Sequence, residues 1–351
     1  MTEITALLRP NVLRMKPYSS ARDEFSGMAL VYLDANENPY PMEFSRYPDP
    51  SHTALRDKIA LMKGLHPSQI FTGNGSDEAI DILIRLFCEP GCDNLLTIAP
   101  SYGMYAVAAD VNNVECRRVM LRPSDFDFTA DSLLMAADGR SKLIFLCSPN
   151  NPTGNMLCRT EIVSLLDRFE GITVVDEAYL DFAAAPSCAE LIDKYPRLVV
   201  LQTLSKAWGA AGIRLGMAFA NPVAIAAMQK IKYSYNLNSS TLEIALERLD
   251  REEDMRRQVE EICAERARLA EGLEQLPTVV KVYPSDANFL LVKVRDANAT
   301  YEALLREGIV VRNRHGLDLC DNCLRITVGV PRENDLLIDA MRKGTSNTIS
   351  V

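Results

Sequence analysis

The chain has 351 residues, of which 48% are apolar and 24% are charged, a composition typical of a folded globular protein rather than a disordered one. This length corresponds to about two domains of roughly 150 residues each. Lys and Arg together number 38 and Asp and Glu 47, so the formal net charge is −9, which argues against a broad surface for nucleic acid or for an anionic membrane.

The sequence also argues against a secreted, membrane-bound or metal-dependent protein. The first twenty residues contain no apolar run of signal-peptide length, and no later stretch approaches the ~20 apolar residues of a membrane span. We therefore expect a cytoplasmic protein. The nine cysteines favour reduced thiols over a disulfide framework in such a protein. Cys320 and Cys323 form a C-x-x-C pair, but a structural zinc site needs about four ligands, so we expect no metal.

Short apolar runs recur from about residue 70 to residue 203, with helical stretches between them. We predict strands over Ile70–Thr72, Leu95–Ala99, Val114–Met120, Lys142–Cys147, Ile172–Asp176 and Leu198–Thr203. Because these runs are apolar on both faces, they are typical of a largely parallel sheet covered by helices. The spacing of apolar residues in Ser76–Cys88 predicts one such amphipathic helix, and Thr160–Phe169 a second.

The pattern changes beyond about residue 240. A long charged helix is predicted from Ser240 to about Gln275. Strands are then predicted over Val279–Tyr283, Phe289–Val294, Ile309–Arg312 and Leu324–Val328, with helices near Tyr301–Glu307 and Glu333–Arg342. This arrangement indicates an α/β protein with an N-terminal segment over residues 1–45, a large domain over 46–240 and a small α/β domain over 241–351.

Polar residues follow the predicted strands of the large domain, at the edge where open parallel sheets bind ligands. The turn Gly75, Ser76 and Asp77 opens a helix, where backbone N–H groups and the helix dipole favour a phosphate, although a plain helix cap explains the same residues. The cluster from Ser148 to Gly154 contains Asn151 and is equally compatible with an ordinary turn.

Two further strand ends carry ionisable groups. Asp176 ends an apolar run, and a carboxylate at the tip of a buried strand is costly unless it meets a cation. Lys206 lies among small and hydroxyl residues after the run that ends at Thr203, with Arg214 eight positions later. A solvated lysine is one interpretation of this pattern. The other is a Schiff-base lysine, whose pKa is lowered by desolvation and by nearby cations.

Together these residues match the requirements of pyridoxal 5'-phosphate, which needs a lysine for its aldehyde, a carboxylate for its pyridinium nitrogen and an anion site for its phosphate. Lys206 would bind the aldehyde and Asp176 the ring nitrogen. Asn151 and Tyr179 would form hydrogen bonds to the phenolic oxygen of the ring. The phosphate would be held by Thr203, Ser205, Arg214 and the Gly75–Ser76–Asp77 turn.

On these residues the sequence resembles the fold-type I pyridoxal-phosphate-dependent aminotransferases, and among them the histidinol-phosphate aminotransferases. The resemblance covers nearly the whole chain. It rests on segments 17–22, 34–39, 46–50, 75–78, 102–105, 148–154, 176–179, 203–206 and 323–329. It implies a large domain with a mostly parallel seven-stranded sheet flanked by helices, a smaller α/β domain, and an N-terminal segment that packs on the small domain or on a partner subunit.

The resemblance also implies roles for residues that the patterns alone leave open. Tyr102 would stack on the cofactor ring, and Tyr47 would reach the cofactor phosphate of the neighbouring subunit in a homodimer. The implied substrate-binding residues are Tyr18, Asn36, Arg312 and Arg325. A guanidinium pair suits both donors of such a reaction, because histidinol phosphate carries a phosphate and glutamate two carboxylates. Solvent-facing arginines in a basic hairpin with Arg314 are the alternative.

The implied activity is transfer of an amino group from L-histidinol phosphate to 2-oxoglutarate, with Lys206, Asp176 and Tyr179 as the catalytic residues. Three alternatives share the fold. A threonine-phosphate decarboxylase would release carbon dioxide from L-threonine phosphate, and an aromatic amino-acid aminotransferase would use phenylpyruvate. A non-catalytic effector-sensing module would carry a DNA-binding region. We expect none, because the segment before Pro17 is too short for a helix-turn-helix and the chain is acidic. The expected partners are therefore small molecules and a second copy of the chain.

Overall fold

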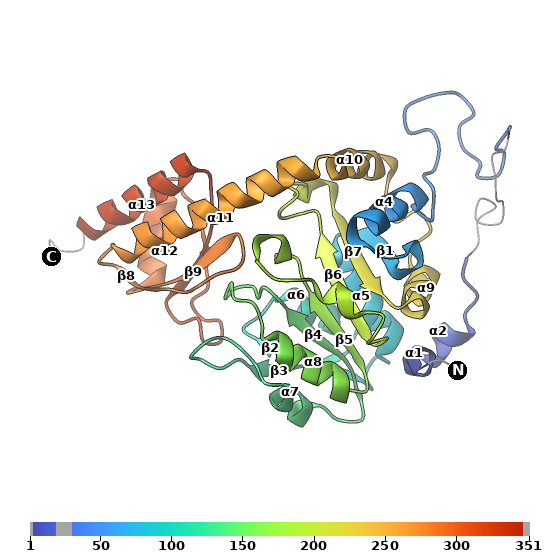
Figure 1. Cartoon of the computed structure of the whole chain (residues 1–351), viewed down its shortest axis with the longest axis horizontal. Helices are drawn as coiled ribbons and strands as arrows, with labels where there is room; N and C mark the ends of the chain where they lie inside the picture. Colours follow the sequence, from blue (N-terminus) through green and yellow to red (C-terminus); the bar gives the residue numbers. More distant parts are fainter. Residues whose placement is uncertain (1–2, 19–29, 347–351) are drawn as a thin grey trace.

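The computed structural model describes residues 3–18 and 30–346, with side chains to residue 343. Two sheets organise the chain (Figure 1), a large one in the centre of the view and a small one at its left. The large sheet has seven strands in the order β1-β7-β6-β5-β4-β2-β3. Its strands are β1 (Ile70–Asn74), β2 (Asn94–Ala99), β3 (Glu115–Met120), β4 (Ser141–Cys147), β5 (Ile172–Asp176), β6 (Leu198–Thr203) and β7 (Leu215–Ala220).

The pairings of β2 with β3 and β4, of β4 with β5 and of β5 with β6 are parallel. This confirms the prediction of a mostly parallel seven-stranded sheet. The strand that the sequence patterns missed is β7, which pairs antiparallel with both β1 and β6. It was missed because Gly216, Ala218 and Ala220 give it few of the β-branched residues that mark a strand.

Helices cover both faces of the large sheet, as its apolar strands require. One face packs against α5, α6 and α9 in a core that includes Phe71, Phe87 and Phe145. The other face packs against α4, α7, α8 and α10. These helices are α4 (Thr53–Lys63), α5 (Ser76–Phe87), α6 (Met104–Val111), α7 (Ala130–Ala136), α8 (Arg159–Arg168), α9 (Pro222–Ile231) and α10 (Ser239–Leu249). Short 3-10 turns are η1 (Pro67–Gln69), η2 (Leu180–Phe182), η3 (Cys188–Leu191) and η4 (Ala211–Ile213).

The predicted helix from Ser240 to about Gln275 is two helices, α10 and α11 (Glu252–Glu274). The chain leaves helical geometry at Arg251, with φ −105° and ψ 41°, and α11 starts with three acidic residues. Negative charge is favourable at a helix N-terminus, so this acidic run marks a helix start that the long periodic pattern concealed. In Figure 1, α11 runs from α10 beside the large sheet to the small domain.

The small domain is a four-stranded antiparallel sheet in the order β10-β11-β9-β8. Its elements are β8 (Val279–Val282), β9 (Phe289–Val294), α12 (Ala297–Arg306), β10 (Arg312–Asn313), β11 (Cys323–Thr327) and α13 (Pro331–Ser346). The predicted strand Ile309–Arg312 is therefore wrong in extent, because only Arg312 and Asn313 pair with β11. One sheet face packs on α11, α12 and α13, and the opposite face, with Phe289 and Leu291, joins the core of the large domain.

The N-terminal helices α1 (Glu3–Leu7) and α2 (Pro10–Arg14) pack on the large domain. The Arg9 guanidinium lies 3.1 Å from the Glu89 carboxylate, and Lys230 Nζ donates to the carbonyl of Leu13. Within one chain, residues 3–14 therefore pack on the large domain, whereas packing on the small domain was one of the two expected arrangements. Packing of the N-terminal segment against a partner subunit stays a prediction.

Candidate active site

One cavity gathers most of the residues that the sequence singled out. It lies at the carboxyl ends of β4, β5 and β6, beside the start of α5. Its lining residues are Ser76, Asp77, Tyr102, Cys147, Asn151, Asp176, Ala178, Tyr179, Thr203, Ser205, Lys206 and Arg214. Because these strands are parallel, residues from five separate parts of the chain meet at one edge of the sheet, as the strand-end pattern predicted.

Asp176 is the most buried carboxyl group in this set, with 2% of its surface exposed. The Tyr105 hydroxyl donates to its Oδ2 over 2.8 Å, and the Ala178 backbone N–H donates to its Oδ1 over 3.1 Å. Burial nevertheless raises the pKa of Asp176 to about 6, because these two hydrogen bonds only partly compensate for the loss of water. The carboxylate is thus placed where a buried cationic group would stabilise it.

Tyr105 is a site residue that sequence reasoning did not assign. It is fully buried, stacks on Phe145 with ring centroids 4.9 Å apart, and meets the edge of Tyr102 at 5.5 Å. Aromatic packing on two sides fixes the direction of its hydroxyl toward Asp176. The available signal was the position of Tyr105 near the start of a largely apolar helix, three residues after Tyr102.

Lys206 lies in the turn that follows β6. Its Nζ is 5.6 Å from the centroid of the Tyr179 ring. The pKa of Lys206 is lowered, first by desolvation of the ammonium and then by the guanidiniums of Arg325 and Arg214. A lysine in this setting gives up its proton more readily than a solvated one, as a nucleophilic amine requires.

The start of α5 forms a cradle of backbone and cationic groups. Gly75 has φ +77°, its N–H donates to the carbonyl of Arg214 over 2.6 Å, and a Cβ there would lie 2.7 Å from Arg214 Nη2. Glycine is favoured here chiefly by the positive φ, which L side chains rarely adopt. Hydroxyls of Thr203 and Ser205 lie 3.0 Å apart beside it. Such a combination of a helix N-terminus, hydroxyls and a guanidinium suits a phosphate.

Gly216 on β7 is a second glycine on which the cradle depends, and sequence reasoning missed it. A Cβ at this position would lie 2.1 Å from the backbone nitrogen of Ser76. No side chain can be accommodated at that distance, so the approach of β7 to the first residue of α5 requires glycine. The signal was weak because Gly216 lies in the unrecognised strand.

Arg325 connects the small domain to the cavity. Its Nη1 donates to Asn151 Oδ1 over 2.7 Å, and Asn151 Nδ2 donates to the Tyr179 hydroxyl over 3.3 Å. The guanidinium also lies over the Phe289 ring, 5.4 Å from its centroid. Arg312 is exposed and lies directly opposite Arg325 in the β10–β11 ladder. The two arginines thus lie side by side on neighbouring strands of the small domain, as predicted.

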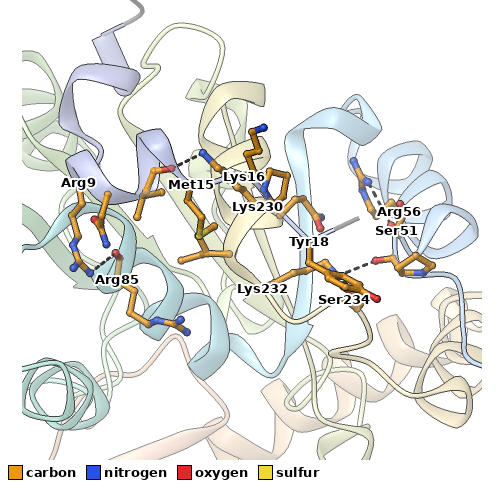
Figure 2. Close-up of a pocket in the computed structure, with 16 residues that line it drawn as sticks. Arg9, Met15, Lys16, Tyr18, Ser51, Arg56, Arg85, Lys230, Lys232 and Ser234 are labelled. Carbon is orange, nitrogen blue, oxygen red and sulfur yellow. Dashed lines mark hydrogen bonds between the residues drawn. The ribbon is translucent and has the colours of Figure 1, made fainter. Parts of the chain in front are cut away.

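Three other predicted site residues line different cavities of the single chain. Tyr18 lines a basic cavity between the N-terminal segment and α9 (Figure 2), near Arg56 and Lys232. Asn36 and Tyr47 line a third cavity, where the Tyr47 ring stacks on Tyr235 with centroids 4.4 Å apart. None of the three lines the Lys206 cavity, so their assigned roles stay predictions that require a second chain. Tyr235 was not recognised from the sequence.

Two features bear on other classes of protein. No helix among the described residues is long and apolar enough to cross a membrane. Within the same residues, no group of three or more His, Cys, Asp or Glu side chains is arranged to hold a metal ion. Cys320, in the turn before β11, and Cys323, the first residue of β11, are both fully buried free thiols.

Comparisons with known proteins identify the family of the chain. Residues 35–341 match the family described as aminotransferase class I and II. A histidinol-phosphate aminotransferase of Parabacteroides distasonis is 58% identical over 97% of this chain and 99% of its own length. The enzyme of the same name from Bacteroides fragilis is 54% identical over 98% of this chain and 99% of its own length.

Solved structures share the fold. A histidinol-phosphate aminotransferase from Sinorhizobium meliloti, in complex with pyridoxal-5'-phosphate, has a TM-score of 0.80 at 24% identity and covers 87% of this chain and 84% of its own. An L-threonine-O-3-phosphate decarboxylase from Porphyromonas gingivalis has a TM-score of 0.73 at 24% identity, over 86% and 91% of the two chains. On the family match and the identity to these full-length relatives, the chain belongs to the aminotransferases of class I and II.

Proposed function

We propose that the chain transfers an amino group from L-histidinol phosphate to 2-oxoglutarate, giving imidazole acetol phosphate and L-glutamate, with pyridoxal 5'-phosphate as cofactor. The observation that carries the proposal is one cavity that holds a lysine of lowered pKa and a buried carboxylate, with an arginine of the small domain hydrogen-bonded to Asn151 in its wall. The names of the relatives that are 44% to 58% identical over nearly the full chain support the substrate.

The residues of the cavity fit this cofactor. Asp176 is a buried carboxylate without a cationic partner among the described residues, and a protonated pyridine nitrogen is the kind of cation that its raised pKa calls for. The Gly75 turn, the hydroxyls of Thr203 and Ser205, and Arg214 would hold the phosphate. Tyr102, half-buried at the cavity wall, would cover the ring.

When bound, pyridoxal phosphate supplies an aldehyde that accepts amines and a ring that withdraws electrons. Lys206 would attach the aldehyde through its deprotonated Nζ, be displaced by the substrate amine, and then carry the proton from the substrate Cα. Asp176 would hold the proton on the ring nitrogen. Tyr179 and Asn151 would donate hydrogen bonds to the phenolic oxygen of the ring, and their mutual contact of 3.3 Å orients both groups.

Arg325 and Arg312 would bind the anionic end of each donor. The two guanidiniums lie opposite each other on antiparallel strands, and a guanidinium can bind a phosphate or a carboxylate through two parallel hydrogen bonds. The contact between Arg325 and Asn151 keeps this group beside the ring-binding residues. One arginine site would therefore serve histidinol phosphate and glutamate in turn.

The coupled reaction tests this function directly. Purified protein is supplied with L-histidinol phosphate and 2-oxoglutarate, and glutamate formation is followed. We expect turnover with this pair, and neither carbon dioxide from L-threonine phosphate nor comparable turnover with phenylpyruvate as the acceptor. Failure to form glutamate, or release of carbon dioxide from L-threonine phosphate, would contradict the proposal.

We also propose a homodimer in which each subunit completes the site of the other. Tyr47 is 50% exposed and stacks on Tyr235, away from the Lys206 cavity of its own chain. A two-fold symmetric interface would let each subunit place Tyr47 at the cofactor phosphate of its partner. Tyr18 and Asn36, which line other cavities of the chain, would reach the substrate in the assembled protein.

Hybrid dimers test this arrangement. Co-expression of a Lys206→Ala chain with a Tyr47→Ala chain gives hybrids with one doubly defective site and one intact site if Tyr47 acts across the interface. Each hybrid should then have about half the activity of the normal dimer by this site count. If Tyr47 acts within its own chain, every hybrid site carries one defect, and co-expression restores no activity.

A further inference from the structure

Three guanidiniums lie on one face of the small sheet, and only two of them have a role in the proposed function. The third is that of Arg314. Arg312 pairs with Arg325 in the antiparallel ladder. The backbone N–H of Arg314 donates to the backbone carbonyl of Cys323 over 2.9 Å, which continues the same register. Because side chains alternate along a strand, Arg312 and Arg314 project from the same face as Arg325. That face meets the large domain at Phe289 and Tyr179.

These three arginines have no counter-charge among the described residues. None of them is within ion-pair distance of a carboxylate in this part of the chain, and the polar partner of Arg325 is the neutral amide of Asn151. The Nε atoms of Arg314 and Arg325 are buried without a hydrogen-bond partner. Arg314 and Arg325 are half-buried, and a guanidinium in that setting without an anion is costly, so the cluster points to a negatively charged ligand.

The groups that face Arg314 do not neutralise it. They are the guanidiniums of Arg325 and Arg312, the Cys320 thiol and the Tyr179 hydroxyl. Burial raises the pKa of Cys320 to about 12 and that of Tyr179 well above its usual range, so both are uncharged near neutral pH. Burial and the two neighbouring arginines lower the pKa of Arg314 to about 10, and it still carries its charge at pH 7.

We propose that Arg314 is a specificity-determining residue that supplies the third positive charge of the substrate anion site and makes this site select a phosphate monoester. This inference rests on the proposed function. A phosphate monoester carries about −1.5 to −2 charges at pH 7 and three acceptor oxygens, whereas the side-chain carboxylate of glutamate carries one charge. Two arginines suffice for a carboxylate. The third therefore favours histidinol phosphate over glutamate.

The test measures each half-reaction of the cofactor-loaded enzyme separately. Arg314→Gln removes the charge, Arg314→Lys retains it, and Arg306→Gln on exposed α12 is the matched control. We expect Arg314→Gln to lower kcat/KM for L-histidinol phosphate by about 10- to 100-fold, as for the loss of a hydrogen bond between charged groups. The kcat/KM for L-glutamate should fall by less than about 3-fold, because a carboxylate with one negative charge gains little from a third arginine. Arg314→Lys should recover most of the loss.

Binding of inorganic phosphate gives a second readout that does not depend on turnover. Phosphate should raise the unfolding temperature of the loaded wild-type enzyme and of Arg306→Gln, since a ligand that binds the folded state stabilises it. It should raise that of Arg314→Gln much less. Equal losses for both donors, or an unchanged phosphate effect in Arg314→Gln, would overturn the inference. Should Arg314→Gln fail to fold, a loss in Arg314→Lys as large for glutamate as for histidinol phosphate would overturn it too.

Failure of the proposed function has a different signature. In that case the wild-type enzyme itself would not transfer an amino group from histidinol phosphate to 2-oxoglutarate. If the wild-type enzyme does catalyse this transfer and Arg314→Gln matches it with both donors, only the role assigned to Arg314 is wrong.

Discussion

Replacing Asp176 with Asn should stabilise the cofactor-free protein while it weakens cofactor binding. Burial raises the pKa of this carboxyl from 3.8 to about 6, so the folded state binds the proton more tightly than the unfolded state does. At 1.36 kcal/mol per pKa unit, the shift corresponds to about 3 kcal/mol of lost stability once the group is ionised. The loss develops as the pH rises from about 4 through about 6 and is complete above that range.

Asn has nearly the same shape as Asp but carries no charge. Its carbonyl oxygen can accept from the Ala178 N–H, while its amide group donates to the Tyr105 hydroxyl, so both contacts of the carboxylate retain a partner. We therefore expect the cofactor-free variant to unfold at pH 7.5 with a free energy up to about 3 kcal/mol above wild type. At pH 4, where the native carboxyl is protonated, the two proteins should be nearly equal.

Urea unfolding at both pH values measures this difference, and the exposed Asp57→Asn variant is the control that should stay within about 0.5 kcal/mol of wild type. With pyridoxal phosphate bound the order should reverse, because only the carboxylate pairs with a protonated ring nitrogen. Turnover of the variant should fall by orders of magnitude. A cofactor-free variant that is no more stable than wild type at pH 7.5, or a difference independent of pH, would refute the reasoning.

Three further substitutions test other parts of the site. Tyr105→Phe removes the hydroxyl that lowers the pKa of Asp176, so the cofactor dissociation constant should rise about 10-fold; an unchanged constant by fluorescence titration would contradict this role. Gly216→Ala should lower the free energy of unfolding by about 1–3 kcal/mol or more, the cost of overpacking. Gly212→Ala, with no atom within 4 Å of the new Cβ, is the control and should have little effect in the same urea experiment. Arg325→Ala should slow the single-turnover absorbance changes with both donors, and an effect on only one donor would show that they do not share this arginine.

Much of the site could be predicted from the sequence because its residues follow apolar strands directly. Asp176 is the last residue of β5, and Lys206 follows β6 by three positions, so parallel pairing alone brings them to one edge of the sheet. The phosphate cradle was predictable in part, since Gly75 opens a helix. In each case a local pattern and the rule for parallel sheets were sufficient.

The parts that could not be predicted depend on contacts between distant segments. Tyr105 is distinguished from any other buried tyrosine only by its contact with Asp176, 71 positions away in the sequence. Gly216 matters because β7 inserts between β1 and β6, and no periodic pattern encodes that order. The stacking of Tyr47 on Tyr235 likewise joins two segments whose proximity no local pattern reveals.

In the proposed function, Lys206 holds the cofactor and is displaced by the amine of histidinol phosphate. Borohydride reduction of the loaded enzyme, followed by digestion and mass spectrometry, identifies the lysine that carries the cofactor. We expect the label on Lys206 and its loss when L-histidinol phosphate is added before the reduction without 2-oxoglutarate. A label on any other lysine, or a Lys206 label that the phosphate donor leaves unchanged, would contradict it.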